Sequence, residues 1–183
     1  DSIRALAIES IEEMAAHGDA CDFATDVALR YPLRVILSLM GLPREDEEMM
    51  LRLTQEIFSP QDPDLSKSGS DVDESQASSY DLSALDEFKQ FFSDLLRERR
   101  AKPTDDIASL IANATIDGEF LSDWDVTSQY IAILTAGHDT TSSSTAGGVA
   151  ALAQAPDQFA LVKNDRSLIP SLIEECVRWT SPL

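Results

Sequence analysis

The chain has 183 residues, 43% of them hydrophobic, which is enough for one domain with a hydrophobic core. Its 14 basic and 33 acidic residues give a formal net charge of −19, which argues against binding to nucleic acid or to anionic membranes. The sequence shows no signal-peptide pattern, no apolar run long enough to span a membrane and no cysteine framework, so a cytoplasmic protein is expected. Two histidines without a CxxC or HExxH pattern argue against a zinc enzyme.

The first half of the sequence predicts amphipathic helices, because apolar residues recur at spacings of three and four. These helices are expected over residues 1–17, 22–40, 44–58 and 82–100. Pro32 predicts a break near Tyr31 in the second helix. Residues 60–81 are rich in Ser, Asp, Glu and Gly and predict a mobile loop.

The second half is also expected to be helical, so the predicted fold class is mainly α with little or no β-structure. Thr104 is a candidate N-cap for a short helix over residues 105–113, and residues 116–120 resemble a tight turn. Ser122 is expected to cap the longest helix, which runs to about Ala153 with an interruption. Two short helices follow, over residues 156–163 and 169–179.

The long helix has apolar flanks around a centre that is poor in helix formers. Three glycines, an aspartate and a run of hydroxyl residues each cost about 0.5–1 kcal/mol relative to alanine inside a helix. Two interpretations are open. Either two helices meet here, with Gly137 as a C-cap and Asp139 or Thr140 as an N-cap, or one helix continues with a local bulge.

The bulged helix would have a chemical purpose. The hydroxyl of Thr140 would bond to the carbonyl of Ala136, four residues earlier, and loosen the helix. The small residues Ala136 and Gly137 would let a flat ligand lie against the backbone. Asp139 and Thr140 would supply an acid and a hydroxyl, which are the parts of a proton relay.

A second motif, EECVRW, ends the last helix. Its Glu175 and Arg178 are three residues apart, on one helix face. Taken alone, this spacing indicates a surface ion pair of little energetic weight.

The hexapeptide AGHDTT at residues 136–141 resembles the (A/G)Gx(D/E)T(T/S) motif in the oxygen-binding helix of cytochromes P450. The resemblance implies that Asp139 and Thr140 are catalytic and deliver protons to oxygen bound over a haem. It implies that Ala136, Gly137 and Thr140 border the haem (iron protoporphyrin IX) and oxygen pocket. His138 occupies the variable position and receives no role.

The resemblance extends over the whole chain. Glu175 and Arg178 match the family's ExxR, which implies a buried structural pair. The stretches CDFATDVALRYPL, MLRLTQEIF and AGHDTTSSS are similar to the bacterial class I branch that oxidises alpha-terpineol. The same likeness makes residues 60–81 the access loop over a substrate pocket.

The family's haem-ligating cysteine loop has no counterpart in the sequence. Cys21 lies at a helix start and Cys176 lies within ExxR, so neither is expected to bind iron. Residues 1–183 are therefore expected to form a partial domain, without an N-terminal part and with the ligand cysteine beyond residue 183. Such a fragment is expected to be inactive alone and to contain no metal ligand.

The resemblance implies a monooxygenase that inserts one atom of O2 into an apolar small molecule. Terpenoids are the first candidates, and steroids and aromatic compounds follow. Electrons would come from NAD(P)H through a ferredoxin, and no nucleic acid or membrane partner is expected. The alternative is a non-enzymatic acidic helical module that binds another protein.

Overall fold

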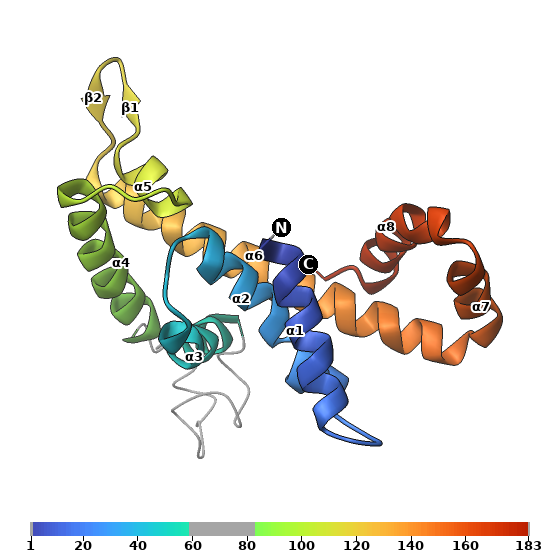
Figure 1. Ribbon diagram of the computed structural model, residues 1–183. Coiled ribbons are helices and arrows are strands. Elements are labelled where there is room, and N and C mark those ends of the chain that lie inside the picture. Colours follow the sequence, from blue (N-terminus) through green and yellow to red (C-terminus); the bar gives the residue numbers. More distant parts are fainter. Residues whose placement is uncertain (1, 59–82, 183) are drawn as a thin grey trace, which may run out of the picture. The chain divides into compact units, whose positions relative to one another are not determined.

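Figure 1 shows the computed structural model of the chain, in which residues 2–58 and 83–182 are described. The described part is mainly α, as the sequence predicts. Its elements are α1 (Ser2–Ala16), the π-helix η1 (Ala24–Ala28), α2 (Arg30–Leu39), the 3-10 helix η2 (Arg44–Asp46), α3 (Glu47–Phe58), α4 (Ser83–Ala101), α5 (Ile107–Ala112), β1 (Thr115–Ile116), β2 (Glu119–Phe120), α6 (Asp123–Gln154), α7 (Pro156–Asn164), the 3-10 helix η4 (Arg166–Leu168) and α8 (Ile169–Thr180). The loop predicted over residues 60–81 lies outside the described residues.

Two compact units make up the chain. One comprises Asp1–Pro32 with Ala136–Leu183, and the other comprises Leu33–Thr135. Within residues 2–58 and 83–182, no helix is both long enough and apolar enough to cross a bilayer.

The break predicted near Tyr31 occurs slightly earlier. The π-helix η1 ends at Ala28, Leu29 is a turn, and α2 begins at Arg30. The amide of Leu29 donates to the carbonyl of Ala24, five residues back, at 2.9 Å. Pro32 therefore sits in the first turn of α2, where a missing N–H costs no helical hydrogen bond.

In the Leu33–Thr135 unit, α4 buries an aromatic face. The Phe88 and Phe92 rings are stacked with centroids 5.7 Å apart, and Phe92 lies 5.5 Å from Tyr130 of α6. Each buried aromatic side chain contributes about 1.5–3 kcal/mol by leaving water. This face fixes α4 against the N-terminal part of α6.

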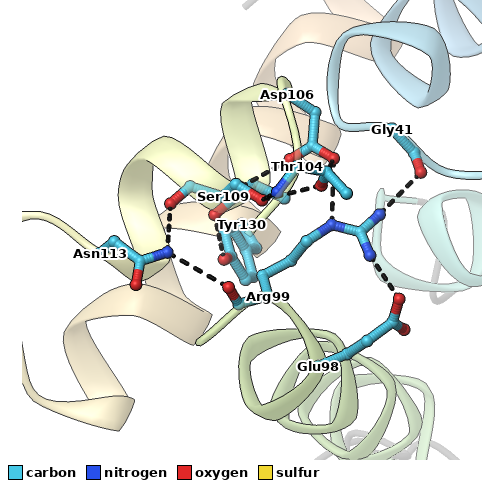
Figure 2. Close-up of polar contacts among 9 residues, drawn as sticks. Gly41, Glu98, Arg99, Thr104, Asp106, Ser109, Asn113 and Tyr130 are labelled. Atoms are coloured by element: carbon cyan, nitrogen blue, oxygen red, sulfur yellow. Dashed lines mark hydrogen bonds and ion pairs between the residues drawn. The ribbon is translucent and has the colours of Figure 1, made fainter. Parts of the chain in front are cut away.

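A buried ion pair joins α4 to the start of α5 (Figure 2). Arg99 Nε donates to Asp106 Oδ2 at 3.0 Å, and Arg99 Nη2 donates to the Gly41 carbonyl at 2.8 Å. The two side chains are only 8% and 6% exposed. Asp106, rather than Thr104, caps α5 by accepting from the Ser109 amide at 2.6 Å. Thr104 instead donates its hydroxyl to Asp106.

Burial opposes ionisation of Asp106, but hydrogen bonds from Thr104 and Ser109 and the charge of Arg99 outweigh it and lower the pKa of that carboxyl. Asp106 is therefore ionised at neutral pH. A hydrogen-bonded charge pair in this setting is costly to break, because the remaining arginine would be buried without its partner.

In the other unit, the C-terminal part of α6 packs closely on α8. A Cβ on Gly147 would overlap the Thr180 methyl group, and one on Gly148 would overlap the Cys176 sulfur. The Thr180 hydroxyl also donates to the Cys176 carbonyl at 2.8 Å. The two glycines inside α6 therefore allow close helix packing, which explains why they occur here despite the unfavourable helix propensity of glycine.

We expect Asp106→Asn to lower the free energy of unfolding by about 3 kcal/mol, because it leaves the buried Arg99 with only the exposed carboxylate of Glu98 as a charged partner. The wild-type pair should also weaken as the pH falls below about 4, since a lowered folded-state pKa stabilises only the ionised form. Urea unfolding followed by circular dichroism measures both effects. Asp123→Asn, at the exposed partner of Arg100, is the control and should cost less than about 1 kcal/mol.

We expect Gly147→Ala to destabilise the protein by about 1–3 kcal/mol, because the overlap with Thr180 outweighs the better helix propensity of alanine. Adding Thr180→Ser removes the methyl group and keeps the hydroxyl. The double variant should recover the loss. Thermal unfolding is measured for the wild type, each single variant and the double variant. Additive effects of the two substitutions, without coupling, would contradict the packing argument.

Candidate functional site

The helix α6 carries the AGHDTT motif, and it is α-helical throughout from Asp123 to Gln154. The interpretation of two helices meeting at residues 136–141 is therefore wrong. Gly137 is not a C-cap, and Asp139 and Thr140 are not N-caps. The interruption expected in the long helix is also absent, since every residue of this described stretch has α-helical hydrogen bonding.

The hydrogen bond predicted for Thr140 is confirmed. Its hydroxyl donates to the Ala136 carbonyl at 2.7 Å, and Thr145 does the same to the Thr141 carbonyl at 2.7 Å. A carbonyl oxygen has two lone pairs, so it can accept from a hydroxyl and from a backbone amide together. This double acceptance explains why the hydroxyl residues leave the helix closed rather than bulged.

Buried residues follow along α6 at intervals of four, as a stripe that turns by about 40° around the helix axis at each step. This buried stripe consists of Val126, Tyr130, Leu134, His138 and Ser142. Successive residues of a helix are about 100° apart around its axis. Ala136 and Thr140, each two residues from His138, therefore lie on the opposite face.

The opposite face carries the small side chains of Ala132, Ala136 and Thr140 together with the larger, half-buried Ile133. Ala132 and Ala136 are exposed, and Gly137, Asp139 and Thr140 are half-buried. Ala136 and Thr140 share this face, whereas Gly137 and Asp139, two residues apart, flank it on opposite sides. A flat molecule could approach the backbone here, because no side chain larger than threonine stands at positions 132, 136 or 140.

His138, to which the sequence assigned no role, is among the most buried polar residues, with 1% of its surface exposed. Its Nε2 lies 2.7 Å from the Leu29 carbonyl. A carbonyl can only accept, so Nε2 carries the proton. The four-residue spacing from Leu134 and to Ser142 could have predicted that His138 is buried, but not that it contacts Leu29.

Burial lowers the pKa of His138, and it outweighs the hydrogen bond to Leu29 and the nearby charge of Asp139. The imidazole is therefore neutral at pH 7. It is a hydrogen-bond donor inside the unit rather than a charged group.

Glu175 and Arg178 form the ion pair that their spacing predicts. The guanidinium donates to both carboxylate oxygens, at 2.6 and 2.7 Å. The side chains are 55% and 66% exposed, so the burial that the family resemblance implied is not found in the described part of the chain. The physical reason is that α8 leaves this face uncovered, as the exposed Ile173 and Trp179 also show.

The two cysteines lie against or between helices. Cys176 packs its sulfur against Gly148 of α6, and Cys21 lies between α1 and η1. Within the described ranges, no group of three or more His, Cys, Asp or Glu side chains is placed to hold a metal ion.

Comparison with known proteins gives concordant matches. The model of the family Cytochrome P450 matches residues 7–167. Cytochrome P450-terp of Pseudomonas sp is 40% identical over 186 residues, which cover all of this chain and 43% of that protein. A steroid C26-monooxygenase of Mycobacterium tuberculosis is 32% identical over 182 residues, covering all of this chain and 46% of that protein.

A solved structure agrees with the sequence matches. The crystal structure of CYP108D1 from Novosphingobium aromaticivorans has a TM-score of 0.81 and 44% identity, and the match covers all of this chain and 41% of that one.

The chain belongs to the cytochrome P450 family, whose members bind haem iron. Within the family it is similar to cytochrome P450-terp, in agreement with the likeness of three stretches to the branch that oxidises alpha-terpineol. The chain spans less than half the length of the curated relatives it matches.

We expect acid to destabilise the protein partly through His138. Because its folded-state pKa is lowered, the stability is complete above the unfolded pKa of about 6.5 and is lost as the pH falls below it. His138→Gln should reduce the loss of unfolding free energy between pH 7 and pH 5, as measured by urea unfolding. Ser142→Ala, on the same stripe, should keep the wild-type dependence.

Proposed function

We propose that the whole protein is a haem-dependent monooxygenase that inserts one atom of O2 into an apolar small molecule. Family membership supports the class of reaction. The observation that carries the proposal for this chain is the open, small-residue face of α6, on which Ala136 and Thr140 lie opposite the buried stripe.

The open face fits a flat prosthetic group. Ala132 and Ala136 on this face, and Gly137 beside it, would let such a group lie close to the helix, because none of them projects beyond a methyl group. These residues would contact one face of haem by van der Waals packing. When bound, haem supplies the iron centre at which O2 is activated.

Thr140 has a defined hydrogen-bonding state. Its hydrogen is committed to the Ala136 carbonyl, so its oxygen is left as an acceptor toward the open face. In this state Oγ1 orients a water or another donor there. It passes a proton onward only when the bond to Ala136 opens.

Asp139 lies beside Thr140 and is half-buried. A carboxylate in this position can take a proton from solvent and release it to a water held by the Thr140 hydroxyl. The pair therefore serves as a relay, with Asp139 as the proton entry and Thr140 as the positioning hydroxyl.

The proposed substrate is an apolar, terpenoid-like molecule, with steroids and aromatic compounds as further candidates. Support comes from the relatives named cytochrome P450-terp and steroid C26-monooxygenase. We also propose that electrons pass from NAD(P)H through a ferredoxin, by analogy with bacterial class I members. Reconstitution of the whole protein with a ferredoxin and its reductase tests this pathway.

We expect Thr140→Ala in the whole protein to uncouple NAD(P)H consumption from product formation and to release hydrogen peroxide. Without this hydroxyl no group holds the water that receives the proton from Asp139, and a positioned acid–base relay contributes about 10²–10⁴-fold to the step it serves. Product and peroxide formed per NAD(P)H consumed are the measured quantities. Thr140→Ser keeps the hydroxyl and should remain coupled, and full coupling in Thr140→Ala would contradict the assigned role.

A further inference from the structure

The contact between His138 and Leu29 joins the motif helix to an irregular point of the backbone. Leu29 stands between η1 and α2, where the hydrogen-bond register changes from five residues to four. π-helical turns of this kind are rare and occur often at functional sites. The His138 side chain reaches the Leu29 carbonyl across 109 positions of sequence, so the contact is a tertiary one.

The irregular point is held by its own local bonds. The Asp22 carboxylate accepts from the amides of Ala24 and Thr25, at 3.0 and 3.2 Å, and so caps the start of this turn. The Leu29 amide closes the turn on the Ala24 carbonyl. The carbonyl offered to His138 therefore has a fixed place, which a mobile loop would not provide.

The position of His138 on α6 lets this contact affect where the site residues lie. Ala136 and Thr140 lie about 200° around the helix from it, one on each side in sequence. A hydrogen bond from one side of a helix to a fixed carbonyl resists rotation of that turn about the helix axis. Rotation, in turn, decides where the Thr140 hydroxyl lies on the open face.

We propose that His138 is a positioning residue for the Asp139–Thr140 pair, holding this turn of α6 in one rotational setting through its hydrogen bond to the Leu29 carbonyl. The inference rests on the proposed monooxygenase function. His138 itself stays outside the chemistry, because its ring is buried on the far side of the helix from Thr140.

The test compares three variants in the whole, haem-loaded protein. His138→Leu removes the donor while filling the space. His138→Gln places an N–H donor at a similar reach and is the conservative rescue. Ser142→Ala, one turn along the same buried stripe, controls for an unspecific change of the buried face.

Two readouts are measured at equal haem content. The first is the product formed per NAD(P)H, and the second is hydrogen exchange of the backbone amides of residues 136–142 without substrate. His138→Leu should lower coupling by about tenfold, because small displacements of a positioned group have large effects on rate. Exchange should quicken by about fivefold, as expected for the loss of one hydrogen bond. His138→Gln and Ser142→Ala should resemble the wild type in both.

Wild-type coupling in a folded His138→Leu protein would overturn the proposal. Coupling in His138→Gln that remains as low as in His138→Leu would overturn it too. A lower melting temperature with unchanged coupling and exchange would show a merely structural histidine and would also overturn it. If the wild type itself consumes no NAD(P)H with any apolar substrate, the proposed function fails. In that case the exchange of residues 136–142 in the three variants decides the positioning role by itself.

Discussion

Two side chains of the buried stripe hold the long helix α6 by hydrogen bonds to main-chain carbonyls outside it. The Tyr130 hydroxyl donates to the Ala108 carbonyl at 2.6 Å in one unit, and His138 bonds to the Leu29 carbonyl at 2.7 Å in the other. Burial raises the pKa of Tyr130 to about 12 and lowers that of His138, so both groups act as neutral donors at pH 7. In the proposed positioning role, the bond from His138 sets the place of the motif residues.

Much of this architecture could be predicted from local sequence. The helices follow from apolar spacing, and the Thr140 bond follows from the tendency of hydroxyl residues to reach the carbonyl four positions back. The hexapeptide at 136–141 is a distinctive local pattern, and it is the basis on which the motif residues are predicted. In each case the relevant atoms lie within one or two helical turns, so a linear pattern contains the needed information.

The remainder depends on contacts between distant parts of the chain. The partner of His138 is 109 residues away, and Asp106, the cap of α5, is also hydrogen-bonded to Arg99 of α4. The helix also stayed closed at residues 136–141, against expectation, since shared carbonyls and packing offset poor propensity. Exposure of Glu175 and Arg178 depends on what covers α8, which spacing cannot specify.

The approach of α6 to α8 imposes a restriction on sequence change in this family branch. Gly147 faces Thr180 and Gly148 faces Cys176, with no room for a further carbon atom at either glycine. A larger residue on one helix must therefore be met by a smaller one on the other. The two position pairs 147/180 and 148/176 should vary together among related sequences, so that evolutionary drift of these helices proceeds by paired rather than single replacements.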